Sequence, residues 1–337
     1  MNIKTEISKI HYNIERKGFF FNVLKLGSFF YGMGSGFKNL MYDAKILTPK
    51  KVNAFVISVG NLTTGGVGKT PYVAELVKKY SKKGNNVAIV SRGYGGRLKG
   101  VNVISDGEEI FFDAKDAGDE PYWLANNTNA VVITSPVRYD GAKLAIEKYN
   151  VDTIILDDGF QHRKLHRDLD IVLTDSEKKL GNENLLPAGP LRESKNGLKR
   201  ADKIVIVSKN ISHIAAENYA ERLKEIYKKP IEICKTEPDF AYNIFNKFER
   251  LENFEKIIAF SGIGQPEQFY KFLKDFDVIK TFDFDDHHSY TQKDIDELQK
   301  YNLPLITTEK DAVKLKTLKF SQKIYALKLK MEIENYD

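Results

Sequence analysis

Six short apolar runs recur along the first two thirds of the chain and predict the framework of the fold. Several are unbroken stretches of valine and isoleucine, which is typical of strands that are covered on both faces. The runs are residues 54–59, 87–90, 130–135, 153–157, 170–175 and 203–208. Helical patterns separate some of them, such as 71–83, which Gly84 closes. We therefore predict an α/β fold with a mostly parallel sheet, helices on both faces, and ligands at the carboxyl ends of the strands.

A second group of alternating segments begins near residue 229. Its apolar or helical stretches are residues 228–235, 256–264, 278–284, 303–315 and 323–333. We therefore predict two domains, 1–228 and a smaller α/β domain, 229–337. Two such lobes with a cleft between them suit an enzyme that closes over two substrates.

The region before the first strand, about residues 19–45, fits an amphipathic helix with lysines nearby. Large apolar residues recur at helical spacing, namely Phe30, Met33, Phe37 and Leu40 or Met41. Two interpretations stay open: a helix packed on the protein's own core, or a basic helix lying on a membrane surface. Its apolar runs are too short for a transmembrane span, and it lacks a signal-peptide cleavage pattern.

Composition and charge narrow the class of protein only a little. The 337 residues are 42% hydrophobic and 29% charged, which fits a soluble or peripheral globular protein. The formal charge of +6 suits an anionic partner, but by itself it does not choose among nucleic acid, anionic lipid and phosphorylated small molecules. Cys234 is the only cysteine, so an intrachain disulfide is excluded.

The strongest motif is a phosphate-binding loop between the first strand and a helix. The consensus is G-x-x-x-x-G-K-[ST], and the matching residues are Thr63, Thr64, Gly65, Gly66, Val67, Gly68, Lys69 and Thr70. Lys69 is expected to neutralise the β- and γ-phosphates of ATP, and the Thr70 hydroxyl to hold Mg²⁺. Thr63 stands where the consensus has its first glycine. The alternative, a glycine-rich turn with an accidental Lys-Thr, leaves the flanking strand and helix unexplained.

A pair of acids follows the run 153–157 and predicts a metal site. Asp157 and Asp158 stand at the end of this strand, with Gln161 one turn further on, in the manner of a Walker B element. The alternative is a β-turn, because Asp-Gly is a strong turn signal.

Four further segments carry candidate side chains. Arg92, in "SRGYGG", can bind a phosphate at the end of its strand, and Arg192 and Glu193 lie in the rigid loop "LLPAGPLRES", which closes over the site or merely connects elements. Asp119 and Glu120, in "AGDEPYW", are a candidate base or a solvated turn. The His-His pair in "DDHHSY" suits proton chemistry or metal binding better than a lone histidine does.

Together these motifs resemble one family, the tetraacyldisaccharide 4'-kinase or lipid A 4'-kinase of Gram-negative bacteria. The resemblance covers most of the chain and includes "ISVGNLTTGGVGKTP", "SRGYGG", "GDEP", "LDDGFQHRKLHRDLDIVL", "LLPAGPLRES", "FSGIGQPEQF", "FDFDDHHSY" and "TTEKDAVKL". It implies ATP-dependent phosphorylation of the 4'-hydroxyl of tetraacyldisaccharide 1-phosphate, giving lipid IVA. It also implies a peripheral enzyme at the cytoplasmic face of the inner membrane, with a lipid A precursor as partner. Nucleic acid and an obligate protein partner are not expected.

The resemblance also assigns roles to individual residues. It makes Asp119 the catalytic carboxylate and His287 the histidine that pairs with it from the second domain, with the choice between His287 and His288 left open. Asp157 and Asp158 become the acids linked to Mg²⁺, assisted by Gln161 and Glu193. Arg92 and Arg192 are implied to contact phosphate.

Three other classes of protein share part of the pattern. A membrane-associated ATPase switch of the MinD or ParA kind shares "GGVGKT", but Thr64 occupies the place of its signature lysine. A GTPase would need Asn-Lys-x-Asp, and the nearest string, "NKFE" at 246–249, ends in glutamate. A non-enzymatic nucleotide- or lipid-binding module leaves Asp119 and His287 without a role.

Overall fold

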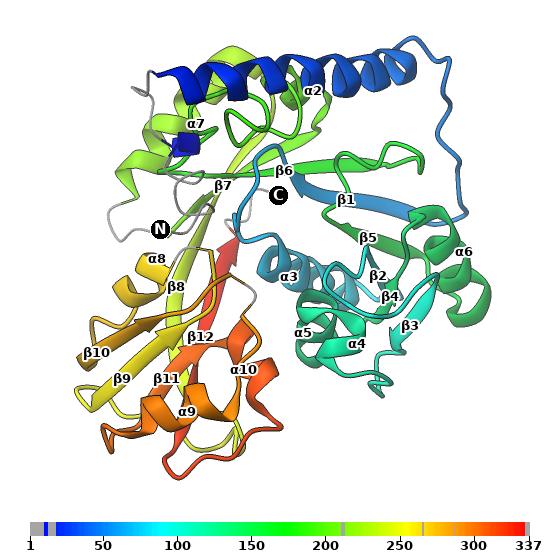
Figure 1. The fold of residues 1–337 in the computed structure, drawn as a ribbon. Coiled ribbons are helices and arrows are strands. Elements are labelled where there is room, and N and C mark those ends of the chain that lie inside the picture. The colour runs from blue at the N-terminus through cyan, green and yellow to red at the C-terminus, as the bar shows by residue number, and fades with distance from the viewer. Residues whose placement is uncertain (1–9, 13–17, 210–212, 265, 287, 334–337) are drawn as a thin grey trace.

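The computed structural model describes residues 10–12, 18–209, 213–264, 266–286 and 288–333. A mixed sheet of twelve strands runs through this part of the chain, in the order β10-β9-β11-β12-β8-β7-β6-β1-β5-β2-β4-β3 (Figure 1). The strands are β1 (Phe55–Asn61), β2 (Val87–Ser91), β3 (Asn102–Ser105), β4 (Val131–Thr134), β5 (Thr153–Asp157), β6 (Leu169–Asp175), β7 (Lys203–Ser208), β8 (Ile231–Asn243), β9 (Lys256–Ser261), β10 (Asp277–Asp283), β11 (Leu305–Thr308) and β12 (Ile324–Ile333). Neighbouring strands are parallel except for β3 with β4 and β12 with β8.

Helices cover both faces of the sheet. They are α2 (Phe19–Asp43), α3 (Lys69–Lys82), α4 (Ala114–Ala117), α5 (Asp119–Asn127), α6 (Arg138–Tyr149), the 3₁₀-helix η1 (Lys195–Arg200), α7 (Ile214–Tyr227), α8 (Pro266–Lys271), α9 (Gln292–Gln299) and α10 (Glu309–Leu315). Successive side chains of a strand point to opposite faces of the sheet. Ile57 and Val59 of β1 therefore face α3 and α5, whereas Val56 faces α6. The predicted α/β class with a mostly parallel sheet is confirmed.

The six predicted strands of the first two thirds are present with shifts of one or two residues at their ends. Residues 303–315 divide into β11 and α10, because Thr308 caps a new helix by accepting a hydrogen bond from the Asp311 amide. The predicted boundary at 228/229 falls between α7 and β8. The sheet itself continues across that point, since β7 pairs with β8 in parallel. The division into two domains therefore stays a prediction.

Candidate active site

The loop from residue 62 to 68 joins β1 to α3 at the carboxyl edge of the parallel strands. Gly65 has a φ of 105° and Gly68 a φ of 89°, backbone conformations that favour glycine. Gly68 precedes α3 without a side-chain cap, and no acidic residue occupies the first turn of that helix. The positive end of α3 therefore lies beside the loop and favours an anion there. The predicted residues from Thr63 to Gly68 thus form the loop, and Lys69 and Thr70 open α3.

Asn61 fixes this loop from the end of β1. Its Nδ2 donates a hydrogen bond to the Thr63 carbonyl oxygen (2.7 Å), and its Oδ1 accepts one from Lys69 Nζ (3.1 Å). Thr70, the next residue, is buried. Sequence reasoning missed Asn61, although its position, directly before the loop, is a signal that could have identified it.

Asp157 ends β5 as a fully buried carboxylate. Its Oδ2 is 3.5 Å from the Ser91 hydroxyl, and no group among the described residues donates a hydrogen bond to its Oδ1. Burial raises the pKa of Asp157 to about 7, and the charges of Glu120 and Asp158 act in the same direction. A buried carboxylate with one unsatisfied oxygen is a site that a cation would stabilise.

Asp158 differs from Asp157 in that two cations contact its carboxylate. Arg192 Nη1 donates to both of its oxygens (2.9 and 2.7 Å), and Lys69 Nζ lies 3.5 Å from Oδ1. Burial alone would raise the pKa of Asp158, but Lys69 and Arg192 outweigh it and hold that pKa below its usual value. Arg192, a candidate phosphate ligand from sequence, is therefore engaged with Asp158 in this structure.

Glu193, the residue after Arg192, is buried, and both of its carboxylate oxygens accept hydrogen bonds. Its carboxylate accepts hydrogen bonds from Asn39 (2.9 Å), Gln161 (3.0 Å) and both Nη atoms of Arg200 (2.8 and 3.2 Å). Gln161 also donates to the Asn61 carbonyl oxygen (2.9 Å). These bonds join α2, the phosphate loop and η1. The geometry thus engages Gln161 and Glu193 with protein groups, whereas the sequence resemblance had linked them to the metal.

Two arginines flank the acids and differ in burial. Arg138 is buried; its Nη1 donates to the Ser135 carbonyl oxygen (2.7 Å) and its Nη2 to that of Asp157 (3.4 Å). Burial lowers the pKa of Arg138 to about 10, while Asp157 and Asp158 oppose that shift. Arg92, predicted to bind phosphate, is exposed at the end of β2. Sequence reasoning missed Arg138, an arginine that directly follows a buried strand and a short turn.

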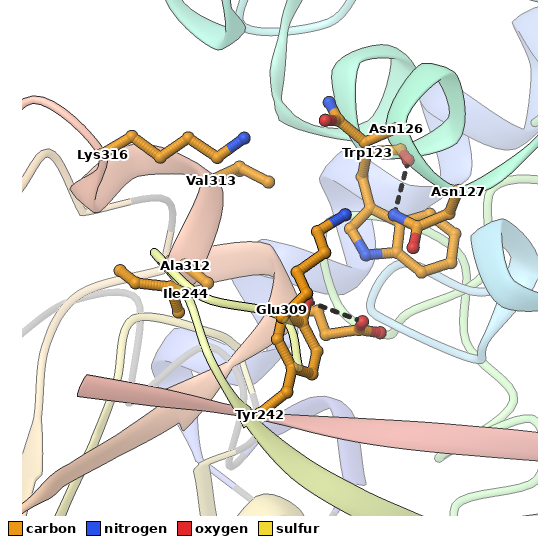
Figure 2. Close-up of a pocket in the computed structure, with 10 residues that line it drawn as sticks. Trp123, Asn126, Asn127, Tyr242, Ile244, Glu309, Ala312, Val313 and Lys316 are labelled. Carbon is orange, nitrogen blue, oxygen red and sulfur yellow. Dashed lines mark hydrogen bonds between the residues drawn. The ribbon is translucent and has the colours of Figure 1, made fainter. Parts of the chain in front are cut away.

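Asp119 and Glu120 open α5 and face α10 from the C-terminal part of the chain. Lys314 Nζ lies 3.3 Å from Asp119 Oδ2, and Lys310 Nζ donates to Glu120 Oε1 (2.8 Å). A small pocket of about 30 Å³ lies beside this contact. Figure 2 shows it between Trp123, Asn126 and Asn127 on one side and Tyr242, Glu309 and Val313 on the other. Sequence reasoning missed the two lysines, whose spacing of four residues in "TTEKDAVKL" places them on one helix face.

Of the two histidines in "DDHHSY", the structure describes one. His287 lies outside the described residues. His288 stacks on Phe284 (ring centroids 4.7 Å apart), and its Nε2 is 3.1 Å from Asp294 Oδ2. Asp286, on the other side of the pair, lies close enough to Lys310 for its charge to raise the pKa of that lysine.

The residues at the end of β5 fit a hard cation in part. The described residues contain no cluster of three or more His, Cys, Asp or Glu side chains arranged to hold a metal ion. Mg²⁺ does not need such a cluster beside a nucleotide, because it is usually bound by one or two carboxylates, waters and the substrate phosphates. Asp157, with its unsatisfied Oδ1, and Thr70 are the side chains that suit this arrangement.

Helix α2 rests on the loop that carries Arg192. Ser28 donates to the Leu185 carbonyl oxygen (2.7 Å), and Tyr31 Oη donates to that of Arg192 (2.9 Å). A Cβ added at Gly32 would stand 2.7 Å from a Leu185 methyl group, so glycine permits this close approach. Small and polar residues of α2, namely Ser28, Tyr31 and Gly32, thus contact this loop.

The opposite face of α2 is apolar and exposed. Four large side chains are between 58% and 65% accessible: Phe30, Met33, Phe37 and Leu40. The interpretation that they pack on the protein's own core is therefore wrong. Within the described part of the chain, no helix combines the length and apolar character that crossing a bilayer requires. Figure 1 shows α2 lying along one outer side of the molecule.

The fold and this site define a nucleotide-binding α/β protein of the phosphate-loop class. A family model described as tetraacyldisaccharide-1-P 4'-kinase matches residues 21–337. The chain belongs to the tetraacyldisaccharide-1-P 4'-kinase family, as the sequence motifs predicted.

Relatives and a solved structure agree with this assignment. The tetraacyldisaccharide 4'-kinase of Halothermothrix orenii is 40% identical over 306 residues, which cover 82% of this chain and 78% of that protein. The enzyme of Geobacter metallireducens is 38% identical over 304 residues, which cover 85% and 86%. The LpxK crystal structure from Aquifex aeolicus, in complex with ATP, has a TM-score of 0.78 and 35% identity, and covers 94% of this chain and 96% of that one.

Family membership decides among the classes that the sequence left open. The chain is an ATP-binding kinase of lipid A biosynthesis, as predicted. The ATPase switch, the GTPase and the non-enzymatic binding module are wrong as descriptions of it. The individual roles of site residues remain predictions.

Proposed function

We propose that this chain transfers the γ-phosphate of ATP to the 4'-hydroxyl of tetraacyldisaccharide 1-phosphate and so forms lipid IVA. The observation that carries the proposal is the convergence of three elements on one edge of the sheet. Lys69 begins α3, Asp157 ends β5, and Glu120, next to Asp119 in α5, is close enough to raise the pKa of Asp157. A phosphate-binding cation, a buried acid and a candidate base thus lie together.

In the proposed step, Asp119 takes the proton of the 4'-hydroxyl while that oxygen bonds to the γ-phosphorus. The bond from phosphorus to the β–γ bridging oxygen breaks, and ADP leaves with the electron pair. Lys69 neutralises charge on the phosphates. We propose that His287 pairs with Asp119 from the second domain, residues 229–337, when it closes over the cleft. Phosphoryl transfer needs little more from a protein than positioning and charge stabilisation.

Asp157 and Thr70 would hold Mg²⁺ at the phosphates. When bound there, the ion would supply positive charge that offsets the negative charge of the phosphates. Asp158 stays ionised and orients Lys69 and Arg192. Gln161 and Glu193 support the loop through the hydrogen bonds described above, and Arg92 lies at the same edge of the sheet as a candidate phosphate contact.

The exposed face of α2 supports a peripheral position at the cytoplasmic face of the inner membrane of a Gram-negative bacterium. An exposed apolar helix face with Lys25 nearby suits an anionic lipid surface. Since α2 contacts the backbone of Arg192 and the side chain of Glu193, a membrane-bound helix would lie directly over the site. This position lets the enzyme reach a lipid substrate without extracting it from the bilayer.

The test is a label-transfer assay with two acceptors that differ at one oxygen. The protein is mixed with Mg²⁺, γ-phosphate-labelled ATP and detergent micelles of either tetraacyldisaccharide 1-phosphate or its 4'-deoxy analogue. We expect labelled lipid with the first acceptor and none with the second. Label in both would place the acceptor hydroxyl elsewhere, and ATP consumed without labelled lipid would contradict the proposal.

A further inference from the structure

Helix α10 carries two lysines to the first turn of α5, and they are held differently. Lys314 Nζ lies 3.3 Å from Asp119 Oδ2, and it is also anchored in its own part of the chain, 3.5 Å from Asp311 Oδ1. Asp311 is buried and accepts hydrogen bonds from the Gly262 amide (3.0 Å) and the Thr308 hydroxyl (2.8 Å). Lys310 reaches out of that part of the chain, and the acceptor of its hydrogen bond is Glu120.

The ammonium group of Lys310 lies in the same charge cluster as the phosphate loop. Burial would lower the pKa of Lys310, but Glu120, Asp286 and Asp157 outweigh that effect and raise it. Glu120 in turn is influenced by Lys69 and Asp158, two residues of the phosphate-loop edge. Lys310 and Lys69 therefore both act on Glu120, and Lys310 adds a second cation to this cluster from a segment that is far from the loop in the sequence.

We propose that Lys310 is a further catalytic residue, which binds the terminal phosphoryl group of the nucleotide and stabilises it during transfer. The inference rests on the proposed kinase function and goes beyond it by naming a phosphate ligand from the second part of the chain. A triphosphate carries several negative charges, so it competes with the single carboxylate of Glu120 for this ammonium group. Glu120 holds Lys310 in place until the phosphate arrives.

The chemistry of phosphoryl transfer explains how the ammonium group of Lys310 contributes to the reaction. Charge spreads over the three equatorial oxygens of the transferred phosphoryl group, and a cation placed there lowers the barrier. Because Lys310 belongs to α10, it is in place only when α10 contacts α5. Full activity then requires the two parts of the chain to meet, which limits transfer of phosphate to water.

The first test needs no lipid and measures the affinities of Mg·ATP and Mg·ADP for the full chain by calorimetry. We expect Lys310→Gln to weaken ATP binding about tenfold and ADP binding less than twofold, because ADP lacks the group that Lys310 contacts. Lys316→Gln, directly after the end of the same helix and directed at Tyr122, is the matched control and should change neither affinity. Equal losses for ATP and ADP, or an unchanged ATP affinity, would overturn the proposal.

A second variant separates phosphate binding from a purely structural contact. Glu120→Gln breaks the same ion pair but keeps Lys310, so the preference for ATP over ADP should persist. If Glu120→Gln lost that preference as Lys310→Gln does, Lys310 would be only a tie between α10 and α5. Lys310→Arg keeps the positive charge and should retain part of the preference, which guards against a Gln variant that folds poorly.

The label-transfer assay distinguishes which phosphate Lys310 contacts. We expect Lys310→Gln to lower kcat on the order of 10²-fold and to leave the KM for the lipid unchanged. A raised lipid KM with unchanged kcat would instead place the 1-phosphate of the lipid at Lys310 and overturn the proposal. If the wild-type protein failed to label the lipid, the proposed function would fall, while the ATP and ADP affinities would still decide the role of Lys310.

Discussion

Two regions of this molecule carry the chemistry, and they are built in opposite ways. The phosphate-loop edge is local: Asn61 and Lys69, eight residues apart, hydrogen bond to each other beside the end of β5. The α5–α10 contact joins Glu120 to Lys310, which are 190 residues apart. Lys69 is 11% exposed, whereas the side chains of Glu120 and Lys310 are 34% and 36% exposed.

The phosphate-loop edge is therefore a preformed part of the site, whereas the α5–α10 contact is a part that can come apart. The loop is held by the backbone of β1 and α3, so its cation is in place before any ligand binds. The Glu120–Lys310 ion pair, which is one third exposed, contributes about 1 kcal/mol or less, so this pair holds α10 against α5 only weakly. A site divided in this way binds nucleotide on its rigid half and becomes complete when the other half arrives.

The largest effect is expected on the preformed side, from Lys69→Ala. This change removes the cation that the loop holds against the phosphates, and it leaves Asp158 paired with Arg192. We expect lipid phosphorylation to fall on the order of 10³-fold, as for loss of a preorganised charge. Lys78→Ala, exposed on the same helix, is the control and should retain activity in the label-transfer assay.

On the separable side, Asp119→Asn should cost somewhat less. We expect the loss of this general base to lower kcat on the order of 10²-fold, the lower end of the usual range for general acid–base catalysis. Because Asn cannot accept the hydroxyl proton, we expect kcat to fall while Mg·ATP affinity, measured by calorimetry, changes less than twofold. Asp140→Asn, exposed at the start of α6, is the control. An unchanged kcat would remove Asp119 from the catalytic step.

The two regions also explain how much of the site the sequence could predict. Thr63 to Thr70 are contiguous, and the strand and helix beside them have strong local patterns, so the segment could be identified from sequence alone, although α3 begins at Lys69 and not at residue 71. The same patterns predicted six strands of the first two thirds of the chain and the helix after the loop. Lys310 and Lys314 were missed because nothing local in "TTEKDAVKL" indicates that their partners lie in α5. Contacts between distant segments depend on tertiary structure, which a pattern of residues does not contain.

Asp157 and Asp158 show that sequence patterns also fail to distinguish the environments of two adjacent residues. The sequence predicted both as acids linked to a metal, because they are adjacent at the end of one strand. Asp158 has a φ of 52°, and this left-handed conformation turns the chain sharply after Asp157. One carboxylate is therefore buried with an unsatisfied oxygen, and the other lies between Lys69 and Arg192. Backbone conformation, rather than residue type, separates their environments.

A smaller effect is expected on the free energy of unfolding, and it has opposite signs for substitutions at Asp157 and at Asp158. The pKa of Asp157 is raised to about 7, so its proton stabilises the folded state at low pH, and this stability is lost as pH rises from about 4 to about 7. Asp157→Asn removes that buried charge and should raise the free energy of unfolding at pH 8, without nucleotide or metal, by on the order of 2 kcal/mol.

Asp158→Asn should act in the other direction. The pKa of Asp158 is lowered, so its contribution is fully present above its ordinary pKa and is lost only as pH falls through the lower, folded-state value. Its removal at pH 8 should destabilise the protein by about 1 kcal/mol, a value reduced by solvent screening. Urea unfolding of both variants is the measurement. Destabilisation by Asp157→Asn would contradict the assignment of a buried, ionised carboxylate at pH 8.

The smallest effect concerns the α5–α10 contact itself, for which the chain contains its own probe. Trp123 is the only tryptophan and lines the pocket between α5 and α10, which also includes Tyr242 and Glu309 (Figure 2). Salt at 1 M reduces the Debye length to about 3 Å and should weaken the exposed Glu120–Lys310 pair. We expect a small red shift of Trp123 emission as water enters the pocket.

Glu120→Gln gives this last experiment its control, because it removes the pair without touching the pocket. The variant should show the red-shifted emission already at low salt and respond little to further salt. If the wild type and the variant had the same emission at every salt concentration, packing of α10 against α5 would hold the contact instead of charge. The second part of the site would then be as preformed as the phosphate loop, and the contrast between the two regions would disappear.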